Sequence, residues 1–178
     1  EELKKRERHC AEILTKEMGK PLNESINEIR GANSRIKFFL KNSEETLRPL
    51  NLSKNESMGE EIEFDPLGVI GNISAWNYPY LIGVNVFIPG LICGNTVLYK
   101  PSEYTSLTGL EIQNIFNDIG LPQNAFSVAI GERSIGQEVL NLPLDGIFFT
   151  GSYKTGLSIH NEVSKNLIPV GLELGGKD

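Results

Sequence analysis

The spacing of apolar residues changes near residue 65. In the first third of the chain, apolar side chains recur every three or four positions, which is the period of an amphipathic helix. One helix is predicted over residues 3–18 and ends at Gly19-Lys20-Pro21; a second is predicted over 22–46. It ends before Pro49, because proline cannot continue a helix. Residues 60–64 then predict a short edge strand that carries charge on one side.

From Gly68 onward, short apolar runs alternate with helical stretches. This alternation is typical of an α/β fold with a doubly wound parallel sheet, here preceded by the N-terminal helical segment. We expect residues 1–65 to belong to the same domain as the sheet, which residues 66–178 form. Strands are predicted over 68–74, 96–99, 125–130, 146–150 and 168–174, and helices over 80–93, 107–119, 135–140 and 153–165.

The stretch between Asp65 and Lys100 contains no charged residue, so a transmembrane helix is the alternative to a buried βαβ segment. Pro66, Pro79 and Pro89 interrupt the stretch, and repeated glycines weaken a helix further. Strands of a parallel sheet are covered on both faces and carry few charges. The buried βαβ segment is therefore the prediction, with no membrane as a partner.

Charge and cysteine content exclude further classes of protein. The formal net charge is −6, which argues against nucleic acid or an anionic membrane as a general partner. The two cysteines, Cys10 and Cys93, cannot build a disulfide framework, and no Cys/His cluster suggests a metal site. We expect a cytoplasmic protein without a metal.

Ligands of a doubly wound sheet bind where its strands end, so the turns after the strands are the candidate site. All five predicted turns carry polar or glycine-rich segments. These are Ala75-Trp76-Asn77-Tyr78-Pro79, Lys100-Pro101-Ser102-Glu103, Gly131-Glu132-Arg133, Gly151-Ser152 with Gly156, and Glu173-Leu174-Gly175-Gly176.

The usual nucleotide motifs are missing from these turns. No two glycines are separated by a single residue, so a GxGxxG fingerprint is impossible. Gly151 and Gly156 have the spacing of a P-loop, but Leu157-Ser158 follows where Lys-Ser/Thr is required. A helix that starts at Ser152 could still receive a phosphate on its free N–H groups. The plainer alternative is that Ser152 only caps that helix.

Three further features each allow a functional and a plainer interpretation. Lys100 and Glu103 suit ribose hydroxyls, because an ammonium donates and a carboxylate accepts hydrogen bonds, or they form an exposed ion pair. Asn77 could direct its amide at a developing oxyanion, or bond its own turn. Glu173 lies at an apolar strand end, where partial desolvation would raise its pKa toward that of a general base. Alternatively, Glu173 reaches solvent.

Five motifs in order make the chain resemble the aldehyde dehydrogenase superfamily. They are Trp76-Asn77-Tyr78-Pro79, Gly94-Asn95-Thr96-Val97, Lys100-Pro101-Ser102-Glu103, Phe149-Thr150-Gly151-Ser152 and Leu172-Glu173-Leu174-Gly175-Gly176-Lys177. The resemblance implies a Rossmann-like fold without GxGxxG and NAD or NADP as cofactor. The cofactor-binding residues that it implies are Ile73, Ser74, Trp76, Asn77, Lys100, Ser102, Glu103, Gly131, Gly151, Ser152, Gly156 and Leu174.

The same resemblance implies a mechanism in which a cysteine thiolate attacks a small aldehyde and the resulting thiohemiacetal is oxidised to a thioester. Asn77 would hold the oxyanion, and Glu173 would activate the water that releases the carboxylic acid. Neither Cys10 nor Cys93 matches the position of the family's nucleophile. We therefore expect a chain truncated at both ends, before its catalytic domain, that is inactive alone.

Two alternatives to this function stay open at the level of the sequence. The chain could be a non-catalytic, nucleotide-binding remnant of a disrupted gene. It could also serve reduction of an acyl-CoA or acyl phosphate, although a water-activating Glu173 would have little use there. For the complete form, the resemblance implies a homo-oligomer and an aldehyde substrate such as a semialdehyde.

Overall fold

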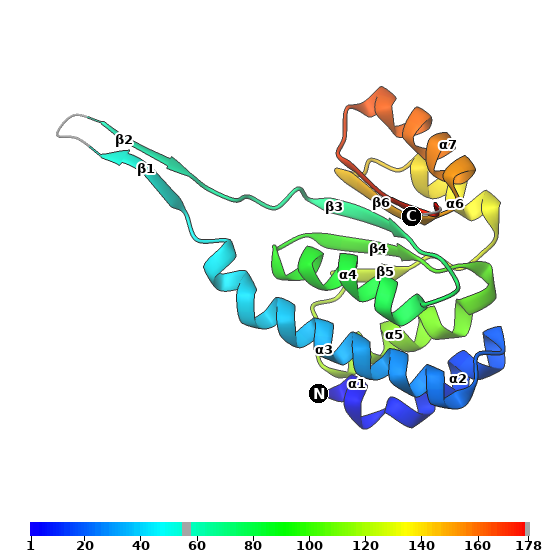
Figure 1. Ribbon diagram of the computed structural model, residues 1–178. Coiled ribbons are helices and arrows are strands. Elements are labelled where there is room, and N and C mark those ends of the chain that lie inside the picture. Colours follow the sequence, from blue (N-terminus) through cyan, green and yellow to red (C-terminus); the bar gives the residue numbers. More distant parts are fainter. Residues whose placement is uncertain (55–57, 177–178) are drawn as a thin grey trace.

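A five-stranded parallel sheet forms the centre of the molecule (Figure 1). The computed structural model describes residues 1–54 and 58–176. The strand order is β5-β4-β3-β6-β7, so the chain winds in one direction from β3 to β5 and in the other from β6 to β7. This order confirms the predicted doubly wound sheet. The strands are β3 (Val69–Ile73), β4 (Thr96–Lys100), β5 (Phe126–Val128), β6 (Gly146–Gly151) and β7 (Val170–Leu174).

Helices cover both faces of the sheet, and each face has its own apolar core. Side chains of α4 and α5 pack in a cluster that includes Phe87, Val97 and Ile112. Side chains of α6 and α7 pack against β6 in a second cluster around Ile147 and Ile159. The predicted helices are found with small shifts of their ends, as α4 (Pro79–Ile92), α5 (Ser106–Asp118), α6 (Arg133–Leu140) and α7 (Tyr153–Val163). Short 3-10 turns add η1 (Glu103–Thr105) and η2 (Ser164–Asn166).

The uncharged stretch forms β3, α4 and β4 of the buried sheet, as predicted. Pro79 occupies the first turn of α4, where its missing N–H costs nothing. Across residues 1–54 and 58–176, no helix has the length and apolar character needed to cross a membrane.

The N-terminal helices lie against the α4 and α5 side of the sheet. They are α1 (Glu2–Lys5), α2 (Glu7–Met18) and α3 (Leu22–Thr46). Their buried side chains, among them Leu14 and Ile29, belong to the same apolar cluster as Phe87. The single helix predicted over 3–18 is interrupted at Arg6, whose guanidinium pairs with Glu2 and also with Glu111 and Asp118 of α5.

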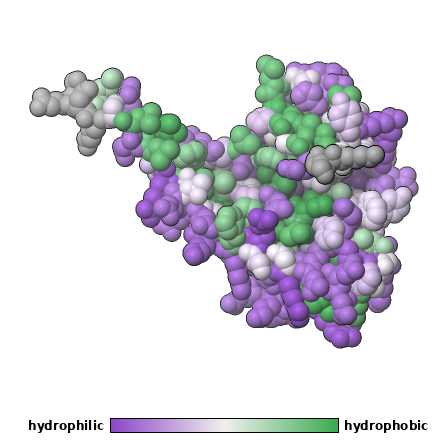
Figure 2. All heavy atoms as spheres, in the orientation of Figure 1, coloured by the Kyte–Doolittle hydropathy of each residue, from purple (hydrophilic) through white to green (hydrophobic). Residues whose placement is uncertain are grey.

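The predicted edge strand over 60–64 is one half of a separate hairpin, which is a correction to the sequence prediction. β1 (Leu50–Lys54) and β2 (Gly59–Ile62) pair antiparallel and join no strand of the central sheet. The hairpin projects from the body of the molecule (Figure 1). β1 escaped prediction because only two of its residues are apolar, and both are exposed. Figure 2 shows hydrophobic residues on this arm, whose exposed apolar side chains include Leu50, Leu52, Ile62 and Phe64.

Glu17 of α2 caps the N-terminus of α5 from outside that helix. Its carboxylate accepts hydrogen bonds from the Leu107 N–H at 2.6 Å and from the Thr108 N–H and hydroxyl at 2.8 and 2.7 Å. We expect Glu17→Ala to lower the free energy of unfolding by about 1–3 kcal/mol, because it leaves these donors without an acceptor. Urea denaturation measures the loss. Glu12→Ala is the control, since the exposed Arg8–Glu12 pair is worth about 0.3–0.5 kcal/mol. Equal losses in both variants would contradict the capping role.

Candidate functional site at the carboxyl ends of the strands

The parallel pairing brings most of the predicted site residues to one edge of the sheet. Ile73 at the end of β3 lies opposite Lys100 of β4. On the other side, Gly151 at the end of β6 lies opposite Leu174 of β7. Because the strand order reverses between β3 and β6, the switch point of the sheet lies between these two pairs.

Ser74 stands at this switch point, directly after β3. Its backbone N–H donates to the Lys100 carbonyl at 3.1 Å, which holds the residue directly after β3. The side chain is buried, and its hydroxyl interacts with that of Tyr99, where it opposes the rise in the Tyr99 pKa that burial causes.

Lys100 and Glu103 lie together, but they do not form the exposed pair of the plainer interpretation. Only 4% of Lys100 is exposed, and its Nζ donates to the Pro101 carbonyl at 3.0 Å. The Nζ is 3.8 Å from a carboxylate oxygen of Glu103, which is half-exposed. Burial lowers the pKa of Lys100 against the opposing effect of Glu103. A buried ammonium beside an accessible carboxylate offers one donor and one acceptor at the edge, and both fit ribose hydroxyls.

Ser102 connects this pair to the following turn. Its Oγ accepts a hydrogen bond from the Tyr104 N–H at 3.3 Å and so caps η1. The same hydroxyl lies 3.4 Å from a carboxylate oxygen of Glu103. Ser102 therefore orients the carboxylate of Glu103, which is predicted to bind ribose hydroxyls.

Ser152 caps α7, as the plainer interpretation has it. Its Oγ accepts from the Thr155 N–H at 3.3 Å. This bond does not exclude a phosphate, because the first turn of a helix presents several N–H groups that lack intrahelical partners. The cap and the anion site are compatible at this helix end.

The glycines of the edge allow close packing. A Cβ at Gly156 would lie 2.5 Å from Leu174 Cδ2, so a larger residue would displace the Leu174 side chain or move α7 away from β7. The Leu174 side chain thus packs against α7. At Gly131, where φ is 153°, a Cβ would lie 2.3 Å from the Ile135 side chain.

The loop before α4 presents Trp76, Asn77 and Tyr78 to solvent. Among the described residues, the Asn77 side-chain amide makes no hydrogen bond, which is contrary to a turn asparagine that bonds its own backbone. Its backbone carbonyl instead accepts from Lys20 Nζ at 2.7 Å. The amide is therefore free to donate to a ligand.

Glu173 is exposed, which agrees with the second of its two interpretations, a carboxylate that reaches solvent. β7 is the outer strand of the sheet and pairs only with β6, where Glu173 lies opposite Thr150. Its neighbours Leu172 and Leu174 pack in the apolar cluster with α7, so Glu173 lies on the other face of the sheet. Lys177, the last residue of the motif that contains Glu173, lies outside the described residues.

Two residues that contact the loop of Asn77 were not predicted from the sequence. Lys20 and Glu28 form a buried ion pair beneath the Asn77 loop. The sequence carried one signal for Glu28, since it falls at helical spacing among the buried residues Ser25, Ile29 and Ala32 of α3. A carboxylate in a buried stripe needs a partner, but the sequence alone does not say which.

Neither cysteine belongs to the site. Burial raises the pKa of the Cys10 thiol, which lies in the interior between α2 and its neighbours. Cys93 is half-buried at the far end of α4 from Asn77. With a rise of 1.5 Å per residue, this helix separates the two by about 20 Å.

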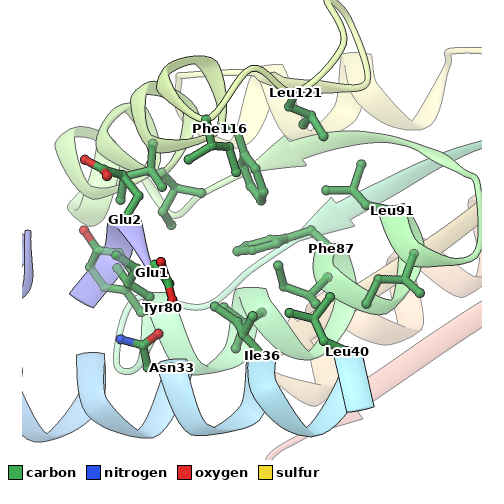
Figure 3. A pocket seen from close by; sticks show the side chains of 17 residues that line it. Glu1, Glu2, Asn33, Ile36, Leu40, Tyr80, Phe87, Leu91, Phe116 and Leu121 are labelled. Carbon is green, nitrogen blue, oxygen red and sulfur yellow. The ribbon is translucent and has the colours of Figure 1, made fainter. Parts of the chain in front are cut away.

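An apolar cavity lies away from this edge. It has a volume of about 400 Å³ and lies between α1, α3, α4 and α5, lined by residues such as Ile36, Phe87 and Phe116 (Figure 3). None of the predicted site residues lines it. Among residues 1–54 and 58–176, no group of three or more His, Cys, Asp or Glu side chains could hold a metal ion.

Comparison with known proteins shows which protein family this chain resembles. A family model described as "Aldehyde dehydrogenase family" matches residues 1–178. N-succinylglutamate 5-semialdehyde dehydrogenase of Legionella pneumophila (strain Corby) is 31% identical over 100% of this chain and 36% of its own length. Betaine aldehyde dehydrogenase of Rhizobium johnstonii is 35% identical over 98% of this chain and 36% of its own length. The chain therefore spans about a third of the length of these relatives.

Solved structures agree in fold. The succinic semialdehyde dehydrogenase from Streptococcus pyogenes in complex with NADP+ has a TM-score of 0.92 and 27% identity, over 99% of this chain and 39% of that one. The betaine aldehyde dehydrogenase from Staphylococcus aureus in complex with NAD+ also has a TM-score of 0.92 and 27% identity, over 99% of this chain and 36% of that one. The whole described fold thus has counterparts in solved dehydrogenases.

Proposed function

The chain belongs to the aldehyde dehydrogenase family, and on this premise we propose that it is the cofactor-binding part of an enzyme that oxidises an aldehyde to a carboxylic acid. The observation that carries the proposal is the shared strand-end edge, where Ser74, Lys100 and Ser152 meet the switch point of a doubly wound sheet. We also propose that the nucleophilic cysteine comes from sequence outside this chain, because neither Cys10 nor Cys93 lies at the edge.

The donor set of the edge fits NAD or NADP. Lys100 and Glu103 would hold the adenosine ribose, and the first turn of α7 at Ser152 would hold the pyrophosphate. Ser74 would line the cofactor at the switch point through its backbone. When bound, the cofactor would supply the hydride acceptor. Solved relatives in complex with NADP+ and with NAD+ support either form.

Two residues of this chain would serve the chemistry. The free Asn77 amide would donate a hydrogen bond to the oxygen of the attacked carbonyl as negative charge develops on it. Glu173 would accept a proton from the water that cleaves the thioester. Because Glu173 is exposed here, the desolvation that suits a general base would come from surroundings outside this chain.

The substrate class and the oligomeric state of the complete form are two further proposals. We propose an aldehyde with a polar end, such as a semialdehyde, because relatives are named for semialdehydes and betaine aldehyde. We also propose that the complete form is a homo-oligomer, and the exposed apolar side chains of the β1–β2 hairpin support this. A nucleotide-binding remnant without catalysis is the alternative function, and it predicts the same edge.

Trp76 is the single tryptophan of the chain and would lie beside the cofactor, so its fluorescence tests the proposal. We expect NADH or NADPH to quench it in a saturable way. Glu103→Gln should raise the Kd for the preferred nucleotide by about tenfold, because it removes a charged acceptor for ribose hydroxyls. Glu24→Gln, the same change at an exposed position of α3, should leave Kd unchanged. A folded chain that neither nucleotide quenches would refute the cofactor site.

A further inference from the structure

A buried ion pair lies beneath the loop that carries Asn77. Lys20 follows the end of α2 and Glu28 belongs to α3, and Lys20 Nζ is 2.5 Å from Glu28 Oε2. The two residues are only 7% and 4% exposed. Taking two charges out of water is costly, and their attraction compensates only when further hydrogen bonds satisfy both groups. The partners of each charge therefore indicate what the pair does.

Lys20 holds the loop from its N-terminal side. Its Nζ donates to the backbone carbonyl of Asn77 at 2.7 Å. It also lies 3.6 Å from the centroid of the Tyr78 ring, within the range of a cation–π contact. A single ammonium thus contacts two consecutive residues of the loop.

Glu28 holds the same segment from its C-terminal side. Its Oε1 accepts from the Tyr80 N–H at 2.9 Å and from the Leu81 N–H at 3.4 Å. Within the described residues, α4 has no capping side chain of its own, so Glu28 serves as its cap from another helix. Burial raises the pKa of Glu28, while Lys20 and the two amides favour the charged form.

We propose that Lys20 and Glu28 are positioning residues that hold the segment from Asn77 to Leu81 so that the Asn77 amide points at the reacting oxygen. The proposal rests on the proposed function of Asn77. Both side chains are buried, so neither contacts a substrate; they act through the backbone. Oxyanion stabilisation needs donors that are held in place before the reaction, and an exposed loop lacks that rigidity by itself.

We call Lys20 and Glu28, which hold the segment from Asn77 to Leu81, the clamp. Replacing both residues at once tests it without leaving a lone buried charge. The variant Lys20→Met with Glu28→Leu removes both charges and keeps apolar volume, which proteins often tolerate. The matched control is Glu7→Leu with Arg30→Met, which removes an ion pair of 2.9 Å between α2 and α3. Circular dichroism shows first that both variants are folded.

Amide exchange on the 178-residue chain gives a readout that is independent of activity. We expect the Tyr80 and Leu81 amides to exchange at least about tenfold faster in the Lys20/Glu28 variant, because each loses a charged acceptor. Acrylamide should also quench Trp76 more strongly. Lys20→Met with Glu28→Gln keeps a neutral acceptor and should restore part of the protection. The Glu7/Arg30 control should match the parent chain.

Kinetics of the complete enzyme then link the clamp to Asn77. The Lys20/Glu28 variant should lower kcat by about 100-fold with little change in the Kd for NADH, as expected for a misplaced donor. Combined with Asn77→Ala, it should lower kcat no further than Asn77→Ala alone.

Separate results would overturn the two proposals. Unchanged exchange at Tyr80 and Leu81 in a folded variant, or full kcat despite faster exchange, would overturn the clamp. Additive losses with Asn77→Ala would do so as well. If Asn77→Ala itself left kcat intact, the proposed role of Asn77 would fail and the clamp's catalytic purpose with it, whereas the exchange data would still report whether the pair holds the backbone.

Discussion

Asn77→Ala in the complete enzyme is expected to lower kcat by about 10²–10³-fold and to leave the Kd for NADH unchanged. The physical reason is that the amide donates to an oxygen that carries negative charge only during the reaction, so its removal costs roughly 2.7–4 kcal/mol of transition-state stabilisation. Nucleotide binding does not depend on that charge. The structure supports the role, because the Asn77 amide is exposed and has no hydrogen bond among the described residues.

The measurement combines steady-state kinetics with a fluorescence titration of the same samples. Asn85→Ala is the matched control, because Asn85 is an exposed asparagine of α4. It should retain full kcat. Turnover of Asn77→Ala within a factor of about three of the parent enzyme would refute the oxyanion role, since that is less than 1 kcal/mol. Parallel losses of kcat and nucleotide affinity would instead indicate a displaced loop.

Among the substitutions considered, we expect Phe87→Ala to lower the free energy of unfolding most. Phe87 is 2% exposed, and its ring makes edge contacts with Tyr99, Phe116 and Phe126 at centroid distances of 5.3–5.7 Å. Removing a buried aromatic side chain costs the transfer free energy and leaves a void, which together amount to about 3–5 kcal/mol. The loss would be a large share of the stability of a typical domain.

Urea denaturation followed by circular dichroism measures this loss. Phe38→Ala serves as the control, because the Phe38 side chain on α3 is 55% exposed and should cost less than about 1 kcal/mol. A comparable shift of the midpoint in both variants would show that the aromatic cluster does not dominate this core. An unchanged slope with urea concentration shows that the shift reflects stability.

The sheet could be predicted from the sequence because parallel strands that are covered on both faces appear as short apolar runs with few charges. The glycine-rich and polar turns then had to lie at one edge, since all strands run the same way. The hairpin could not be predicted in this way. Leu50 and Leu52 of β1 are exposed, and β2 gains its partner only from the other half of the same arm.

The state of individual side chains depended on tertiary contacts. Lys100 was open to two interpretations, and only its position near α6 and the Pro101 carbonyl shows that it is buried. Glu173 was also open to two interpretations, and only the structure shows that it reaches solvent. Burial depends on which elements pack over a strand, and a local pattern does not contain that information.

What the sequence by itself determined was the order of elements, the parallel sheet and the set of residues at its carboxyl edge, because periodicity and strand direction are local properties of the chain. Only the tertiary structure decided the buried pair of Lys20 and Glu28 and its contacts with the segment from Asn77 to Leu81. The contacts of the pair with this segment join residues that are more than fifty positions apart in the chain. Their interaction energy arises only when α3 and α4 pack together and exclude water from the charges.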